Sequence, residues 1–272
     1  MTTISNPIVE TYSRLAQEYD DELNLRSCWG KAADKALASL LIKDYYHVVL
    51  DIGCGTARAL AQLASTGRSG IQWIGVEPAE NMRKIAASRI RGFSGVKILD
   101  GRFETIPLPS QSVDYTFSIF AFHWTTDLEA SVQELSRVLK PTGEMDLFFI
   151  GRNNGREFIQ ATSPIFLRYL GPALLLESAR MRKQLTKDAA WRLFTQAFSP
   201  TRLAVEESYD TYYDTLEGHW AWWVRIEGHF MKIPPQIKTA CDQEAKTAIS
   251  RLGQGNDIPY TLHLLHVRLR QA

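Results

Sequence analysis

The sequence predicts an α/β fold in which helices cover both faces of a mostly parallel, seven-stranded sheet. Three observations favour this class. Short apolar runs alternate with helical stretches between residues 50 and 150, as in parallel sheets with helical crossovers. The first run, at residues 48–51, ends in Asp51 and breaks into a turn containing Gly53 and Gly55. The second run ends in another acid, Glu77.

The elements of this fold can be assigned in chain order. β-branched and aromatic residues predict strands at 48–51, 71–77, 96–100, 113–120, 144–150, 202–210 and 260–269. Apolar residues at helical spacing predict helices at 57–64, 79–88, 128–139 and 215–231, with another from Pro234 onward. Thr126 precedes Glu129 by three residues, which predicts a capping box. The turn-forming residues 141–143 are expected to end the helix at 128–139 and to lead into the strand at 144–150.

The alternation of strands and helices changes after residue 150. Residues 158–198 favour helix, interrupted at Pro164 and Pro172. We therefore expect a core made of residues 46–150 and 200–272, with a helical cap insertion at 151–199 that forms a lid. The amphipathic start of the chain predicts a second helical lid over residues 1–45.

Composition excludes several classes of function. The 31 basic and 30 acidic residues give a net charge of +1 without a block of like charge, so neither a nucleic acid nor a membrane surface is an expected partner. The apolar runs are shorter than the roughly 20 residues that span a bilayer. Without a signal-peptide pattern, the protein is expected to be cytoplasmic. The three cysteines indicate neither a disulfide framework nor a metal site, and the oligomeric state is left open.

The turn after the first predicted strand indicates a bound adenosine-containing cofactor. Glycines let backbone approach a ligand closely, and Glu77 is placed to accept hydrogen bonds from two ribose hydroxyls. A dinucleotide-binding dehydrogenase would need a third glycine where Arg58 stands. Asp51 would also repel a diphosphate, although it would attract an ammonium group. An ordinary strand-to-helix turn is the remaining alternative.

These residues resemble a known family. The run Asp51-Ile52-Gly53-Cys54-Gly55-Thr56 resembles the signature loop of class I S-adenosylmethionine-dependent methyltransferases, and residues 75–78, 101–107, 112–114 and 135–143 resemble its later segments. The resemblance covers residues 12–150 and implies a Rossmann-like fold with S-adenosylmethionine as cofactor. Beyond residue 150 the layout is similar, more loosely, to small-molecule members that include the malonyl-carrier-protein and trans-aconitate methyltransferases.

The resemblance also implies a set of cofactor-binding residues. Glu77 would bind the ribose, Asp51 the region of the ammonium, and Ser118 would offer its carbonyl to that ammonium. Relatives often carry an aspartate where this chain has Arg102, which has no acceptor, so adenine recognition must use Glu104, backbone groups or water. The implied set is Tyr12, Tyr19, Asp51, Gly53, Cys54, Gly55, Glu77, Pro78, Met82, Arg102, Phe103 and Ser118.

An acceptor pocket is expected beyond the fourth strand. His123 lies at the edge where ligands of open α/β sheets bind, and it is a candidate base for the acceptor's proton. Alternatively, it only forms part of the pocket wall. Aromatic residues of the second half either bind the acceptor or fill the joint between insertion and sheet. The predicted pocket comprises Trp29, Phe122, His123, Trp124, Tyr213 and Trp223.

Three functions remain open on this evidence. The first is methyl transfer to an oxygen or nitrogen of a small metabolite, by direct in-line displacement. The second is methylation of a carrier-protein-bound acyl carboxylate, for which a basic cluster would dock the carrier: Arg180, Arg182, Lys183 and Lys187. The third is a non-catalytic S-adenosylmethionine-binding regulatory module.

Overall fold

Seven strands form one sheet in the order β3-β2-β1-β4-β5-β7-β6. The structure, a computed structural model, describes residues 6–230 and 233–271, without the side chains of 224–230. Strands β1 to β5 run parallel, and β7 is antiparallel to both β5 and β6, so the predicted mostly parallel sheet is confirmed. The strands are β1 (Val48–Ile52), β2 (Gln72–Val76), β3 (Val96–Leu99), β4 (Val113–Ile119), β5 (Leu139–Ile150), β6 (Leu203–Asp214) and β7 (Ile258–Leu269).

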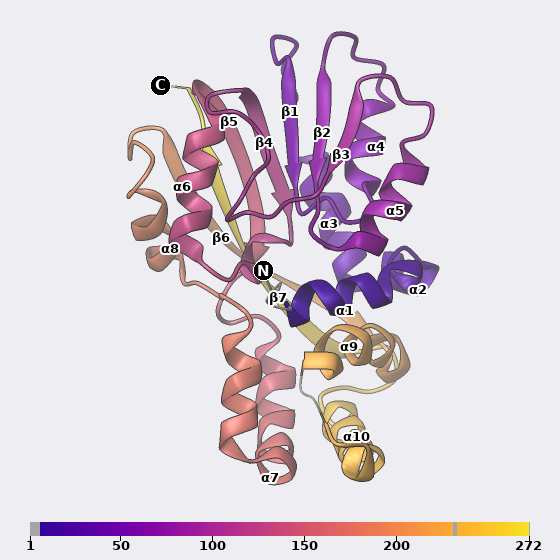
Figure 1. Cartoon of the computed structure of the whole chain (residues 1–272). Coiled ribbons are helices and arrows are strands. Elements are labelled where there is room, and N and C mark those ends of the chain that lie inside the picture. The colour runs from indigo at the N-terminus through magenta and orange to yellow at the C-terminus, as the bar shows by residue number, and fades with distance from the viewer. Residues whose placement is uncertain (1–5, 231–232, 272) are drawn as a thin grey trace, which may run out of the picture.

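Helices cover both faces of the sheet. Residues of α3, α4 and α5 pack with β1 and β2 on one face, and residues of α6 and α8 pack with β4, β5 and β7 on the other. Helices α7, α9 and α10 extend away from the sheet, with α1 and α2 beside its edge (Figure 1). The helices are α1 (Pro7–Leu15), α2 (Glu22–Arg26), α3 (Cys28–Ala38), α4 (Arg58–Ala64), α5 (Glu80–Arg89), α6 (Leu128–Val138), α7 (Arg156–Arg180), α8 (Lys187–Phe194), α9 (Leu216–Phe230) and α10 (Pro235–Ser250).

Two local predictions around α6 are wrong. The cap of α6 is Asp127, whose side chain accepts a hydrogen bond from the Ala130 amide, while Thr126 donates to Glu104 instead. The predicted turn at residues 141–143 lies within β5, which begins at Leu139. Residues 140–143 form an irregularity there, because Val113 pairs with Leu139 whereas Tyr115 pairs with Glu144.

The segment after β5 forms two separate helices rather than one interrupted stretch. Gly171, with φ of 73°, breaks α7 just before Pro172, and Pro164 stays inside the helix. Helix α7 packs against α10, whereas α8 packs against α6 and β6. The last predicted residue of the helix at 215–231 lies outside the described residues. The division into lid, core and cap stays a prediction.

A buried carboxylate joins the parallel part of the sheet to its antiparallel edge. Both carboxylate oxygens of Asp146, on β5, accept a hydrogen bond from the Arg270 guanidinium at 2.8 Å. One of these oxygens lies 2.6 Å from Nε2 of His266, and the other accepts a hydrogen bond from the Tyr115 hydroxyl at 2.6 Å. Burial raises the pKa of Asp146, but the hydrogen bonds from His266, Arg270 and Tyr115 outweigh burial and leave that pKa below its ordinary value. Asp146 therefore stays ionised and holds β7 against β5.

In the described part of the chain, no helix has the length and apolar character needed to cross a membrane.

We expect Asp146→Asn to lower the free energy of unfolding by about 3 kcal/mol, because Arg270 and His266 lose a buried partner. Urea unfolding followed by far-UV circular dichroism measures this loss. Since folding lowers the pKa of Asp146, its contribution is present at neutral pH and disappears as the pH falls through that lowered value. Asp242→Asn, which removes a surface pair with Lys238, is the control and should change stability by under about 0.5 kcal/mol. Equal losses in both variants would contradict this role of Asp146.

Candidate active site

Two adjoining cavities open at the carboxyl ends of β1, β2 and β4. We name them by their acids, the Glu77 cavity and the Asp51 cavity. The Glu77 cavity is also lined by Pro78, Met82, Arg102, Phe103 and Glu104. The Asp51 cavity is also lined by Asn24, Trp29, Cys54, Arg58, His123 and Arg182. Their shared wall consists of Tyr12, Tyr19, Gly53, Gly55, Ile119, Phe120 and Trp124.

The glycine turn after β1 forms the floor between the two cavities. Gly53 has φ of 73°, and a Cβ added there would lie 2.2 Å from the Cβ of Ala121, so neither the backbone angle nor the space admits a larger residue. The amides of Gly53 and Cys54 both donate to the Val76 carbonyl, at 2.7 and 3.1 Å. The turn is thus fixed against the end of β2.

Glu77 follows β2 and holds this turn through its side chain. One carboxylate oxygen accepts the Gly55 amide at 3.0 Å, and the other accepts the Ala79 amide at 2.8 Å. The side chain is buried, with 7% of the residue exposed. Burial raises the pKa of Glu77 above its ordinary value, although these two amides oppose the rise. Each oxygen keeps a lone pair that could accept a further hydrogen bond.

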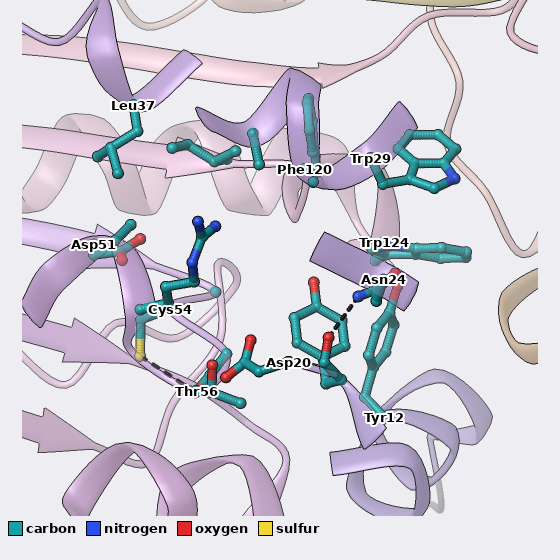
Figure 2. Close-up of a pocket in the computed structure, with 18 of the residues that line it drawn as sticks. Tyr12, Asp20, Asn24, Trp29, Leu37, Asp51, Cys54, Thr56, Phe120 and Trp124 are labelled. Atoms are coloured by element: carbon teal, nitrogen blue, oxygen red, sulfur yellow. Dashed lines mark hydrogen bonds between the residues drawn. The ribbon is translucent and has the colours of Figure 1, made fainter. Parts of the chain in front are cut away.

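Asp51 is a second buried acid, at the end of β1. Only 3% of the residue is exposed, and no other residue in the described part of the chain donates a hydrogen bond to its carboxylate. Burial raises the pKa of Asp51 well above its ordinary value, and the nearby Glu77 raises it further. Figure 2 shows Asp51 and Leu37 at one end of the cavity, with Trp29, Trp124 and Tyr12 toward the other. A bound cation would stabilise the ionised carboxylate.

The start of the chain supplies the aromatic wall between the cavities. The rings of Tyr12 and Tyr19 meet edge to face at 6.0 Å, and Tyr12 meets Trp124 in the same way at 5.9 Å. The Tyr19 carbonyl accepts a hydrogen bond from the Asn24 side chain, drawn as a dashed line in Figure 2. Burial, followed by the charges of Asp20 and Glu77, raises the pKa of Tyr19 to about 12, so this hydroxyl stays protonated.

His123 faces the Asp51 cavity as a neutral ring. The residue is 1% exposed, and neither ring nitrogen has a hydrogen-bond partner among the described residues. Burial, and then the Arg182 guanidinium, lower the pKa of His123 well below its ordinary value. Arg182 itself lies over the Trp124 ring, with its guanidinium carbon 5.3 Å from the centroid. A buried ring without partners is suited to bind a polar group of a ligand.

The structure brings most of the predicted cofactor residues together. All of them line one or both cavities except Ser118, which is fully buried and donates from its hydroxyl to the Ile52 carbonyl at 2.6 Å. Ile119 and Phe120, one and two residues later, line the cavities in its place. The roles given to these residues stay predictions.

The predicted acceptor residues are divided among several places. Trp29, His123 and Trp124 line the Asp51 cavity, whereas Trp223 lines a separate cavity beside α7. Phe122 belongs to the core beneath α8, where its ring lies 5.0 Å from Phe149 and 5.4 Å from Phe194. Tyr213 lies on β6 with 61% of the residue exposed and lines none of the three cavities in the described structure.

Several cavity residues were missed or misplaced by the sequence analysis. Phe120 has φ of 61°, a left-handed conformation that is rare for a bulky residue, and no sequence signal marks it. Asn24 and Asp20 come from the predicted lid at residues 1–45, where the sequence singles out only Tyr12, Tyr19 and Trp29. Arg182 was predicted as part of a docking cluster, but it lines the Asp51 cavity. The described residues contain no group of side chains able to hold a metal ion.

Comparison with known proteins agrees with this geometry. Residues 50–146 match the family model described as a methyltransferase domain. The chain is 33% identical over 138 residues to an uncharacterised methyltransferase of Geobacillus kaustophilus, covering 50% of this chain and 60% of that protein. It is 32% identical over 159 residues to a malonyl-[acyl-carrier protein] O-methyltransferase of a Methylovorus species, covering 56% and 52%. The chain thus spans about half to three-fifths of the length of these relatives.

Solved structures show the same fold at lower identity. The YcgJ protein of Bacillus subtilis superposes with a TM-score of 0.59 at 19% identity, covering 89% of this chain and 99% of that one. An S-adenosylmethionine-dependent methyltransferase of Thermotoga maritima gives 0.55 at 19% identity, covering 97% and 100%. Together with the glycine turn, the buried Glu77 and the strand order already described, these matches show that residues 50–146 carry a methyltransferase domain, in a fold shared with solved methyltransferases.

Proposed function

We propose that this protein is a cytoplasmic enzyme that transfers a methyl group from S-adenosylmethionine to an oxygen or nitrogen of a small metabolite. One observation carries the proposal. Two adjoining cavities, each with a buried acid, meet at a wall of aromatic rings and glycine backbone. A cofactor with a nucleoside at one end and an ammonium at the other matches that division.

The residues present fit this cofactor. The remaining lone pairs of Glu77 can accept the ribose hydroxyls, and Met82 and Phe103 offer buried apolar surface to the adenine. Asp51, a buried acid without a hydrogen-bond donor among the described residues, can pair with the ammonium. Gly53 leaves the backbone bare where the cofactor would cross from one cavity to the other. When bound, S-adenosylmethionine supplies a methyl group already activated by a positively charged sulfur.

The work of the protein is then to position the acceptor and exclude water. Trp29 and Trp124 line the Asp51 cavity and would hold the acceptor in line with the methyl group. Alignment of two reactants can supply about 7–11 kcal/mol of the barrier. His123, neutral and without a partner among the described residues, would take the acceptor's proton on a ring nitrogen. Helices α1 to α3, which contribute cavity residues, would act as the lid.

The relatives favour one alternative acceptor. Some of them are named malonyl-[acyl-carrier protein] O-methyltransferases, which suggests a carrier-bound acyl carboxylate. Of the basic cluster proposed to dock a carrier, Arg182 lines a cavity, which leaves Arg180, Lys183 and Lys187 for an outer surface. A non-catalytic S-adenosylmethionine-binding module is the third possibility.

Incubation with S-adenosylmethionine labelled in its methyl group separates these functions. We expect label to enter a compound of low molecular mass when a metabolite extract is supplied, because the Asp51 cavity has a volume of only about 140 Å³. Label in an added acyl carrier protein instead would favour the alternative acceptor. Tight S-adenosylhomocysteine binding without any transfer would support the regulatory module and overturn the enzyme proposal.

Glu77→Gln tests the cofactor site. We expect it to weaken S-adenosylhomocysteine binding at least tenfold in isothermal titration calorimetry, because hydrogen bonds to a charged acceptor contribute about 1.5–3 kcal/mol each. Glu80→Gln, at an exposed acid three residues along on α5, is the matched control and should bind normally. An unchanged affinity in Glu77→Gln, with an unchanged melting temperature, would remove the ribose assignment.

His123→Asn tests the proposed base. We expect turnover to fall about 10²-fold or more while S-adenosylhomocysteine affinity is kept. Because folding lowers the pKa of His123, its ring is already neutral at pH values near and below 6.5, so the wild-type rate should stay level as the pH falls from 8 to about 6. A loss under tenfold in the variant would assign His123 to the pocket wall instead.

A further inference from the structure

A third cavity lies between the two halves of α7. The break at Gly171 splits this helix, and residues from both sides of the break line the space. Its volume of about 230 Å³ exceeds the roughly 150 Å³ of an apolar protein cavity that holds benzene. We call it the α7 cavity. It is lined by Asn154, Gly155, Phe158, Ile159, Thr162, Ser163, Phe166, Leu175, Ser178, Ala179, Arg182, Gln184, Trp223 and Tyr260.

The apolar part of the α7 cavity is a rigid aromatic surface. Phe166 stacks on Trp223 with ring centroids 5.8 Å apart, and Phe158 meets Tyr260 edge to face at 5.0 Å. All four rings are almost completely buried. Tyr169, on the same helix, donates to Glu244 of α10 at 2.7 Å, which fixes the first half of α7 from outside. The cavity is thus a preformed site for a ring or a short apolar chain.

Arg182 connects this cavity to the Asp51 cavity, because its side chain lines both. The two cavities also face each other across an aromatic pair, since Trp29 lines one, Tyr260 lines the other, and their rings lie 6.2 Å apart. Gln184 lies close by, and its side-chain NH₂ group is buried without a hydrogen-bond partner among the described residues. The Arg182 guanidinium and the Gln184 amide donor therefore line the same cavity as the four buried rings.

We infer that the α7 cavity holds the apolar body of the acceptor, and that Arg182 and Gln184 bind a carboxylate on it. A planar guanidinium matches the geometry of a carboxylate, and the Gln184 amide would add a second donor. The acceptor is then an apolar carboxylic acid that reaches from the α7 cavity to the Asp51 cavity. Its identity as a methyl acceptor rests on the proposed function, whereas its binding in the α7 cavity does not.

The experiment uses the whole protein saturated with S-adenosylhomocysteine, and two probes of equal size. These are 3-phenylpropanoate and its uncharged analogue 3-phenylpropan-1-ol, measured by calorimetry. We expect the carboxylate to bind about tenfold tighter than the alcohol, as the gain from a charge-assisted hydrogen bond predicts. Arg182→Gln should abolish this difference. Arg180→Gln, at an exposed arginine that lines none of the three cavities in the described structure, should keep it.

Larger side chains that fill the α7 cavity test whether the probes bind there. Ser163→Phe and Ala179→Phe enlarge side chains on opposite halves of α7, and Ala179 is exposed enough to accept the change without unfolding. Each should lower the affinity of both probes at least tenfold while S-adenosylhomocysteine still binds. Equal affinity for the two probes, or unchanged probe binding in both filled variants, would overturn the inference. Failure of S-adenosylhomocysteine to bind would count against the proposed function alone, since probe binding can also be measured without it.

Discussion

The site depends on one carboxylate that joins two turns of backbone. Glu77 accepts the amides of Gly55 and Ala79, so the turn after β1 and the start of α5 are held to the same side chain. The turn is also bound to the end of β2 through the Val76 carbonyl, and Gly53 lies too close to Ala121 for a side chain to fit. The residue that faces the cavity is therefore also the residue that shapes it. Under the proposed function, cofactor binding and local structure are linked at Glu77.

Charge is distributed unevenly around the Asp51 cavity. Two buried acids, Asp51 and Glu77, lie near the glycine turn, and Arg182 lies by Trp124. His123 lines the same cavity, and burial and Arg182 keep it neutral. A cavity with these contents favours a cation near the turn and an anion near α7. This is the charge distribution that the proposed donor, with its positive sulfur, and the proposed acidic acceptor require.

Local motifs let the sequence predict the half of the site that comes from the first strands. The glycine turn, Asp51 and Glu77 are fixed by short-range geometry: a strand end, a tight turn and the next strand end. The other half could not be predicted in this way. Phe122 and Trp124 stand two residues apart in one short turn, yet one faces the core and the other faces the cavities. Which ring faces where depends on packing against α8 and α1, which lie far away in the sequence.

The path of the chain after β5 explains the remaining differences. The sequence predicts helix over 158–198 with interruptions at Pro164 and Pro172; the chain breaks at Gly171, directly before Pro172, but the cavity that the parted halves of α7 leave has no local signal. Arg182 follows that break, and only the folded chain brings it beside Trp124. Tyr213 lies on a strand at the edge of the sheet, where its ring faces solvent. These positions are set by tertiary contacts rather than by local pattern.

The pair of acids has a consequence for the end of the catalytic cycle. Under the proposed function, departure of the methyl group turns a positively charged sulfur into a neutral thioether. The negative field of Asp51 and Glu77 attracts the positive sulfur and not the neutral one, while their contacts with the ammonium and the ribose are common to donor and product. The same two side chains that retain the donor would thus loosen their hold on the spent product and help to clear the cleft for another turnover.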